Sequence, residues 1–247
     1  MTRLLAFDTS TEAMSIALCL PDRTLLHEGP GGALASAQLL PTIRGLMAQG
    51  GISFAQLDAI GFGRGPGAFT GLRTACSVAQ GLALGIGRPV LPLDSLMVVA
   101  QDALDGTETR PSHDAFELWV AMDARMDEVY AARYRWPGDS AAAQWQVSSA
   151  PALYTLAALA DRWTSEPALC VAGSAVGAFA DRLPWGTARR IPTTRSRAAA
   201  LSALARRSWL RGEAVDAALA LPIYLRDKVA QTTAERDATR AARELAT

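Results

Sequence analysis

The sequence predicts an α/β protein of two lobes, each built from a mixed sheet with flanking helices. The first observation is the order of elements, three strands followed by helix, strand, helix, strand and helix, which occurs twice along the chain. The second is that each copy opens with a strand ending at an aspartate, Asp8 or Asp123, before a polar turn and another strand. The third is length, because 247 residues, 50% of them hydrophobic, can fill two modest cores.

The elements of the first copy follow from apolar runs and turn residues. Leu39, Ile43 and their apolar neighbours recur at helical spacing, which predicts a helix from about residue 36 that Gly50 and Gly51 end. Two further helices are expected to open around residue 69 and at residue 95. Apolar runs bounded by turn residues predict strands at 4–7, 14–20, 24–27, 59–62 and 90–93.

The second copy repeats this order. Its strands are predicted at 116–122, 128–134, 145–147, 169–172 and 190–191. Its helices are predicted at 152–163, from the Gly-bounded turn 173–177 to residue 182, and at 196–209. We therefore expect a first lobe at 1–100, a second lobe at 101–222, and a polar tail at 223–247 that is partly helical or disordered.

The duplicated order resembles the actin-like (ASKHA) architecture of acetate kinase and actin. In such ATPases the two aspartate turns hold phosphates from opposite lobes, and a Gly-rich turn of the second lobe carries the adenosine. The alternative is that each aspartate only caps its own turn through its side chain. Candidates for a vestigial, nucleotide-like site are Asp8, Thr9, Ser10, Asp123, Gly173 and Gly177.

A Gly-rich loop joins the strand at 59–62 to the following helix. Its sequence, Gly-Arg-Gly-Pro-Gly-Ala-Phe-Thr-Gly-Leu-Arg, occupies residues 63–73. So many glycines before a helix free backbone N–H groups to face a bound group or a neighbouring chain. The other interpretation is a tight turn that needs positive φ. The loop residues of interest are Gly63, Arg64, Gly65, Pro66, Gly67, Gly71 and Arg73.

Composition limits the classes of partner and compartment. Basic and acidic residues balance at 24 each, so the chain has no basic field to hold nucleic acid unaided. The widely spaced Cys19, Cys76 and Cys170 lie in apolar runs and are expected to be reduced. Because no signal peptide and no membrane-spanning run is found, we expect a cytoplasmic protein without membrane contact.

Other chemistries are less well supported. A P-loop needs Gly-Lys-Ser/Thr, and the only lysine, Lys228, lies far from any Gly-rich turn. Gly63, Gly65 and Ala68 formally match a dinucleotide-binding pattern, with Asp94 as the ribose-binding acid, but the extra glycines and the preceding block of three strands and a helix weaken this match. No histidine or cysteine falls at metal-ligand spacing, and no nucleophile elbow is present.

The Gly-rich motif at 63–73 closely resembles the signature of the bacterial TsaB (YeaZ) family, which works in making threonylcarbamoyladenosine beside the anticodon of tRNAs. One departure is Ala35, where the family often carries a histidine. Further similar segments occur in the family's order at 8–10, 36–41, 94–96, 122–125, 128–130 and 222–226.

This resemblance implies a non-catalytic subunit rather than an enzyme. The catalytic paralogue, TsaD, holds a metal with two histidines, and Ser95 and Val99 stand at the corresponding places here. Since neither is a good ligand, no metal and no cofactor are expected. The implied partners are a TsaD-like paralogue and a TsaE-like ATPase, with a homodimer when the chain is alone and tRNA reached only through the complex. A free-standing actin-like ATPase or kinase and, less well supported, a peptidase are the alternatives.

The helix after the Gly-rich loop is the expected partner surface, because it lacks a polar face. One apolar stripe, including Leu72 and Ala79, suits packing on the first sheet. A second stripe of small residues suits close approach of another helix, although both stripes could instead be buried within one chain. The expected interface residues are Leu39, Ile43, Thr74, Val78, Gly81 and Gly85.

Overall fold

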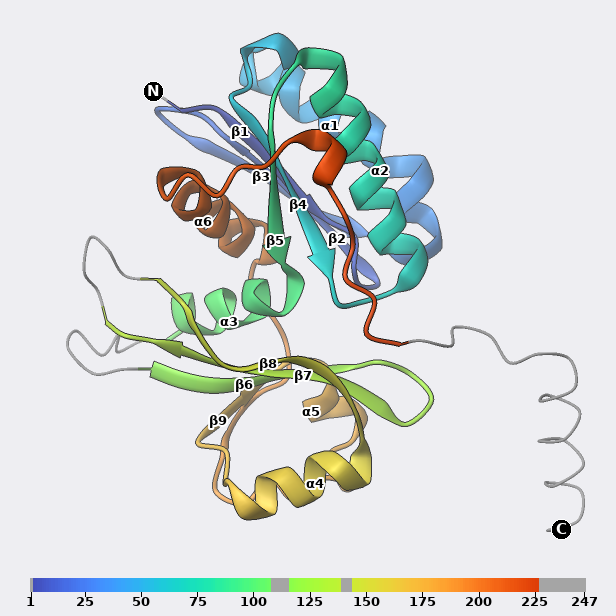
Figure 1. The fold of residues 1–247 in the computed structure, drawn as a ribbon, viewed down its shortest axis with the longest axis vertical. Coiled ribbons are helices and arrows are strands. Elements are labelled where there is room, and N and C mark those ends of the chain that lie inside the picture. Colours follow the sequence, from blue (N-terminus) through green and yellow to red (C-terminus); the bar gives the residue numbers. More distant parts are fainter. Residues whose placement is uncertain (1, 108–115, 139–143, 227–247) are drawn as a thin grey trace, which may run out of the picture.

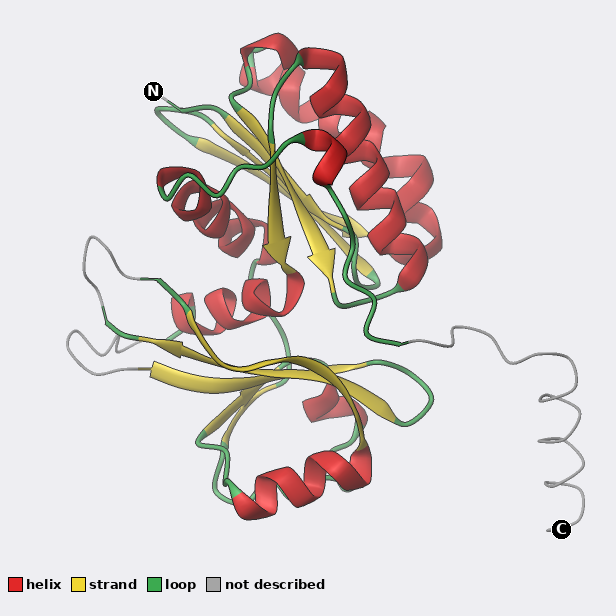
Figure 2. Ribbon diagram, viewed as in Figure 1, coloured by secondary structure: helices red, strands yellow, loops and turns green. Residues whose placement is uncertain are grey.

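Two five-stranded sheets, one in each lobe, form the framework of the computed structural model, which describes residues 2–107, 116–138 and 144–226. Figure 2 shows the sheets one above the other with helices on their outer faces and between them. The predicted tail beyond Arg226 lies outside the described residues. Among those described, no helix combines the length and the apolar character needed to cross a bilayer.

The first lobe is built on the sheet β3-β2-β1-β4-β5, in which β1 pairs antiparallel with β2 and parallel with β4. Every residue of β1 is buried, as suits a strand covered on both faces. Helix α1 is capped at its C-terminal end by Gly51, whose φ of 68° is the left-handed conformation that glycine adopts freely. The elements are β1 (Leu4–Asp8), β2 (Ala13–Cys19), β3 (Thr24–Pro30), η1 (Gly32–Leu34), α1 (Ala35–Gly50), η2 (Phe54–Gln56), β4 (Ala59–Gly65), α2 (Phe69–Ile86), β5 (Val90–Asp94) and α3 (Ser95–Asp105).

The second lobe repeats this topology with the sheet β10-β9-β6-β7-β8. Strand β6 takes the place of β1, pairing antiparallel with β7 and parallel with β9. The prediction of a duplicated two-lobe fold is therefore confirmed. The elements are β6 (Phe116–Asp123), β7 (Glu128–Trp136), β8 (Gln146–Thr155), α4 (Leu156–Ser165), β9 (Cys170–Ala172), α5 (Ala175–Ala178), β10 (Arg189–Ile191) and α6 (Arg197–Leu210), followed by η3 (Ala217–Leu219).

The layers follow from three buried clusters. One fills the space between the first sheet and helices α1 and α2, and another lies between the second sheet and helices α4 and α5. The third joins both sheets through α3 and α6, so that Leu4 of β1 and Val120 of β6 share a core with Leu201 of α6. Figure 1 shows α3 and α6 between the sheets.

Helix α6 and the segment 215–226 return to the first lobe after the second sheet is complete. Helix α6 packs on β1 and β2, and Val215 exchanges two backbone hydrogen bonds of 2.9 Å with Val90 of β5. Further on, the Ile223 amide donates to the Arg64 carbonyl at 2.7 Å. The predicted lobe boundaries at residues 100 and 222 remain predictions, but the first lobe takes part of its packing from residues beyond 196.

Two predicted helices differ from the structure. The helix predicted at 152–163 is wrong at its start, because residues 152–155 pair with β7 as the end of β8, with Ala152 opposite Ala131. Helix α4 begins only after Thr155, whose side chain accepts the Ala158 amide at 3.2 Å. The helix predicted to reach residue 182 ends at Ala178, and Gly177, a weak helix former, lies inside it.

Candidate functional site

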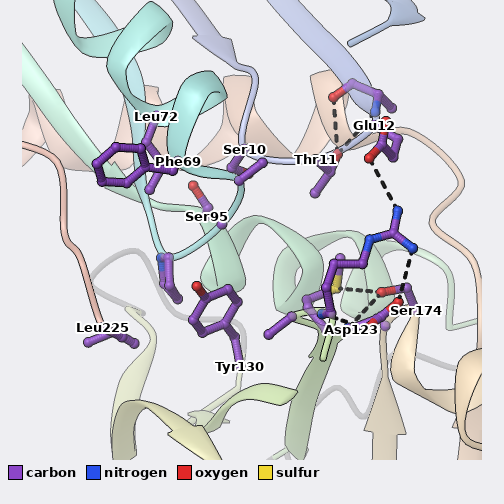
Figure 3. A pocket seen from close by; sticks show the side chains of 18 of the residues that line it. Ser10, Thr11, Glu12, Phe69, Leu72, Ser95, Asp123, Tyr130, Ser174 and Leu225 are labelled. Atoms are coloured by element: carbon purple, nitrogen blue, oxygen red, sulfur yellow. Dashed lines mark hydrogen bonds and ion pairs between the residues drawn. The ribbon is translucent and has the colours of Figure 1, made fainter. Parts of the chain in front are cut away.

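A cavity of about 720 Å³ lies between the two lobes. Its walls come from the turn after β1, the Gly-rich loop, the starts of α2 and α3, the turn after β6, the start of α6 and residues 223–226. Figure 3 shows Ser10, Thr11 and Glu12 facing Asp123 and Ser174 across this space. This is the place between the lobes where the actin-like resemblance puts a nucleotide.

Asp8 has its carboxylate turned into the protein rather than into the cavity. The Ser10 amide donates to Asp8 Oδ1 at 2.6 Å, and Arg197 Nη2 of α6 lies 3.3 Å from Asp8 Oδ2. The two side chains are 0% and 6% exposed. Neither Asp8 nor Thr9 is among the residues that line the cavity, whereas Ser10 is. Asp8 therefore caps its own turn and neutralises a buried arginine.

Asp123 forms the same local turn but stays near the surface. The Arg125 amide donates to Asp123 Oδ1 at 2.8 Å, and Arg125 Nη1 lies 3.5 Å from Asp123 Oδ2. Arg125 Nη2 also reaches Glu12 Oε1 of the first lobe at 3.2 Å, so one guanidinium joins the two turns across the cavity (Figure 3). The Asp123 amide donates to Ser174 Oγ at 3.0 Å, which places the second Gly-rich turn beside it.

The Gly-rich turn of the second lobe contributes Gly173 and Ser174 to the cavity wall, but not Gly177. Gly173 has a φ of +123°, and a side chain there would overlap the Ala121 carbonyl oxygen. A Cβ at Gly177 would meet nothing within 4 Å. Of the six residues expected in a vestigial nucleotide site, the cavity thus brings together Ser10, Asp123 and Gly173.

The glycines of the loop at 63–73 allow the chain's own atoms to approach closely. A Cβ at Gly63 would overlap the Asp8 carboxyl, and one at Gly71 would overlap the Thr9 carbonyl oxygen. Thr9 in turn donates its hydroxyl to the Gly71 carbonyl at 2.7 Å. Gly67 lies as close to Ser10, and Gly65 has a φ of +106°. The loop therefore packs closely against the turn after β1. This contact accounts for its glycines without a bound group or a neighbouring chain.

Other residues of this loop have separate roles. Pro66 lines the cavity. Arg64 is half-buried, and its carbonyl accepts the Ile223 amide. Its side chain lies near Asp94. Arg73 covers the Phe69 ring, with Cζ 3.7 Å from the ring centroid, and its Nε donates to the Tyr224 hydroxyl at 3.3 Å. Arg73 thus contacts both rings of the aromatic pair formed by Phe69 and Tyr224 beside the start of α2.

Asp94 and Tyr134 form a buried hydrogen bond between the lobes. The Tyr134 hydroxyl donates to Asp94 Oδ2 at 2.7 Å, while Oδ1 caps helix α3 by accepting the Leu96 and Met97 amides. Burial raises the pKa of the Asp94 carboxyl, opposed by these hydrogen bonds and by the charge of Arg64. Burial, followed by the Asp94 charge, raises the pKa of Tyr134 well above its usual value.

The positions expected to replace metal ligands are both buried, with Ser95 2% and Val99 1% exposed. Ser95 Oγ accepts the Gly65 amide at 3.1 Å, so it supports the Gly-rich loop. Within the described ranges, no group of three or more His, Cys, Asp or Glu side chains could hold a metal ion.

The expected partner surface needs one correction. Leu39 and Ile43 are 0% exposed and lie in the first lobe's own core, because their stripe of α1 faces the sheet. On α2 the stripe that includes Leu72 and Ala79 is buried as predicted. The second stripe lies outward, with Thr74 and Val78 half-buried and Gly81 and Gly85 exposed.

Sequence reasoning missed Arg197, Arg226 and Tyr130 as residues of the site. Arg197 is separated from Asp8 by 189 positions, and no motif connects them. Arg226 donates to the Ala124 and Arg125 carbonyls and pairs with Glu128, which ties the end of the described chain to the second lobe. Tyr130 was part of a family landmark, yet only its position on β7 places it in the cavity wall.

Comparison with known proteins agrees with this architecture. The family model of TsaD, tRNA N6-adenosine threonylcarbamoyltransferase, matches residues 33–167. The tRNA threonylcarbamoyladenosine biosynthesis protein TsaB of Haemophilus influenzae is 43% identical over 128 residues, 51% of each chain. TsaB of Escherichia coli strain K12 is 38% identical over 133 residues, 54% of this chain and 55% of the relative. The chain thus spans about half the length of these curated relatives.

Two solved structures match over nearly the whole fold. YeaZ from Pseudomonas aeruginosa has a TM-score of 0.75 and 36% identity, and covers 91% of this chain and 100% of its own. A Pseudomonas aeruginosa protein described as similar to peptidase YEAZ has a TM-score of 0.78 and 38% identity, and covers 92% and 100%. With the family model matching more than half of the chain, these likenesses show that the chain belongs to the TsaB (YeaZ) family.

Proposed function

We propose that this chain is an accessory subunit in the synthesis of threonylcarbamoyladenosine, the modified base beside the anticodon of tRNAs. The support is its membership of a family whose relatives are named as biosynthesis proteins for this base. The match to the family model of the transferase itself fits a paralogue of that enzyme. The balanced charge of the chain fits a subunit that meets tRNA only through its complex.

The catalytic step is assigned to a TsaD-like partner. The resemblance puts the partner's metal-binding histidines where this chain has Ser95 and Val99, and both are buried. Ser95 already accepts the Gly65 amide. A TsaE-like ATPase completes the proposed assembly. A free-standing ATPase or kinase is less well supported, because the Asp8 carboxylate is buried against Arg197 and does not line the cavity.

The outer face of α2 is the proposed docking surface for the TsaD-like paralogue, and for a second copy of this chain when the paralogue is absent. The observation that carries the proposal is that Gly81 and Gly85 are exposed, with nothing within 4 Å of a Cβ at either position. A glycine inside a helix costs about 1 kcal/mol relative to alanine, which close approach of a partner helix would offset. Leu84, 64% exposed, lies on the same helix.

The test is the variant Val78→Glu with Gly81→Arg. We expect a folded monomer in light scattering, loss of the TsaD-like paralogue in a pull-down, and loss of the modified base from cellular tRNA. Because Val78 is half-buried, Gly81→Arg alone provides a second variant at a fully open position.

A matched control places the same charges on exposed leucines elsewhere, Leu169→Glu with Leu210→Arg, which are 76% and 82% exposed. This control should keep the dimer, the paralogue and the modification. If the α2 variants stay folded and still bind both partners, the α2 surface is not the docking element.

A further inference from the structure

The last described residues, 220–226, run from the first lobe to the second along one side of the cavity, and we call them the strap. Ile223, Tyr224, Leu225 and Arg226 of the strap line the cavity. In the view of Figure 1 the strap, coloured red, descends on the right, whereas α3 and α6 join the two sheets on the left. The lobes are therefore connected both by the buried helices and by the strap.

The strap is anchored to the first lobe at three points. The Cys76 thiol of α2 donates to the Ala220 carbonyl at 3.2 Å. The Ile223 amide donates to a carbonyl of the Gly-rich loop at 2.7 Å. The centroid of the Tyr224 ring lies 4.7 Å from that of the Phe69 ring. These contacts follow one another along the strap, so its whole length is held against the first lobe before it reaches the second.

The polar contact of the strap with the second lobe is made by one side chain. Arg226 Nη2 donates to the carbonyls of Ala124 and Arg125 at 3.0 and 3.2 Å. The same nitrogen pairs with the Glu128 carboxylate. Because the Arg226 side chain is only 18% exposed, water competes little for these charge-assisted bonds. Hydrogen bonds to charged groups contribute more than neutral ones, so this contact is a substantial link between the lobes.

The turn that Arg226 contacts has an uncommon backbone. Residues 125–127 all have left-handed φ, of 65°, 59° and 57°, and none of them is glycine. This conformation is unfavourable for residues with a Cβ and persists only where surrounding contacts compensate for it. The bonds from Arg226 to two carbonyls of the turn are such contacts. Arg125 of the same turn also pairs with Glu12 of the first lobe. Loss of Arg226 would therefore weaken both polar links between the lobes.

We propose that the strap and the turn 124–128 form a latch that keeps this side of the cavity closed. Release of Arg226 lets the turn relax and the lobes move apart. Helices α3 and α6 act as the hinge, because they pack in the core that the two sheets share. The strap side is then the entrance to the cavity. The latch lies within one chain and is tested on that chain alone, so its failure would leave the proposed function untouched.

The first experiment measures the distance between the lobes by double electron–electron resonance. Nitroxide labels are attached at Ala55→Cys in η2 and Asp161→Cys in α4, both exposed positions far from the latch. The three native cysteines are buried, and the chain without the introduced pair gives the background signal. An excess of unlabelled chain suppresses distances between copies. We expect Arg226→Ala to shift the distance distribution to longer values and to broaden it.

The second experiment follows the turn itself by hydrogen exchange with NMR detection. Within the turn, the Ala124 amide donates to the Glu128 carbonyl and the Glu128 amide to the Arg125 carbonyl. In Arg226→Ala these two amides should exchange about tenfold faster, as expected for the loss of one charge-assisted hydrogen bond.

Two further variants separate the strap from the turn. Arg226→Glu places a negative charge beside Glu128 and should open the lobes at least as far as Arg226→Ala does. Arg182→Ala is the matched control, because Arg182 pairs with Asp127 of the same turn from within the second lobe. It should leave the distance between the lobes unchanged.

Either of two results would overturn the proposal. One is a wild-type distance distribution in Arg226→Ala and Arg226→Glu chains that urea unfolding shows to be folded, which would mean that the core around α3 and α6 alone holds the lobes. The other is an opening in Arg182→Ala as large as in Arg226→Ala, which would mean that the turn acts without the strap.

Discussion

The turns after Asp8 and Asp123 share one motif and have different surroundings. In both, a carboxylate oxygen at the end of a strand accepts the amide two residues on, at 2.6 Å from Ser10 and 2.8 Å from Arg125. Asp8 is then enclosed by Gly63 and Arg197, while the Asp123 side chain keeps 20% of its surface exposed. The turn after Asp123 also carries three left-handed residues, 125–127, at its exposed tip.

This difference teaches that a short motif fixes the backbone of a turn but not its chemistry. The chemistry depends on what packs over the carboxylate. A buried carboxylate needs a permanent countercharge, which α6 supplies to Asp8 from a distant part of the sequence. A partly exposed carboxylate such as that of Asp123 remains in part solvated and needs only a weak ion pair.

The largest expected effect comes from replacing each aspartate by asparagine. Asparagine keeps the oxygen that accepts the turn amide, so the substitution removes only the charge. Asp8→Asn leaves Arg197 buried without its countercharge and should lower the free energy of unfolding by about 3–5 kcal/mol. Asp123→Asn should lower it by less than about 1 kcal/mol. Urea unfolding measures the free energy of unfolding of each variant. Equal decreases in the two variants would show that the different burial of the two aspartates does not affect their contribution to stability.

Asp94 sharpens the comparison, because it is a third strand-end aspartate that is buried beside a tyrosine hydroxyl. Burial raises the pKa of Asp94 in the folded chain above its value of about 3.9 when unfolded. Its contribution to stability is therefore present below that unfolded value and is lost as the pH rises through the folded pKa. The stability of the wild type relative to Asp94→Asn should therefore fall as the pH rises above the unfolded value of about 3.9.

The control for this prediction is Asp127→Asn. The hydrogen bond from Arg182 holds the pKa of Asp127 below its usual value. The stability of the wild type relative to Asp127→Asn should therefore rise, not fall, as the pH increases. If the free energies of unfolding of the wild type and of Asp94→Asn changed with pH in parallel, burial would not raise the pKa of Asp94.

The smallest effect concerns the ion pair that joins the two turns. Glu12 and Arg125 have side chains 78% and 69% exposed, so a double-mutant cycle of Glu12→Ala and Arg125→Ala should give a coupling below about 1 kcal/mol. Raising the salt concentration to about 1 M should remove most of it. A coupling free energy above about 2 kcal/mol that added salt does not reduce would show that this ion pair behaves like the buried pair of Asp8 and Arg197.

Much of the fold could be predicted because hydrophobic periodicity and turn residues mark its elements locally. The duplicated order and the buried stripe of α2 follow from such patterns. The start of α4 could not be found in this way, because pairing of Ala152 with Ala131 overrides a local preference for helix. Helical spacing also revealed the stripe of Leu39 and Ile43 without showing that it faces the first lobe's own sheet.

The candidate site was less predictable because its residues meet only in three dimensions. The sequence indicated the two aspartates as a pair at strand ends. It carried no signal that Arg197 would neutralise Asp8, since the contact depends on the return of α6 to the first sheet. Nor could it show that the glycines at 63–71 serve close contact with the turn after β1.

The return of α6 and residues 215–226 to the first lobe has a consequence for synthesis on the ribosome. Translation proceeds at about 5–20 residues per second, and domains generally fold as they emerge. The strands of the second sheet, β6 to β10, all emerge before Arg197, whereas the first sheet waits for α6 to cover β1 and β2. Val215, which pairs antiparallel with Val90 beside β5, emerges later still. The first lobe is therefore the first to be translated and the last to be completed.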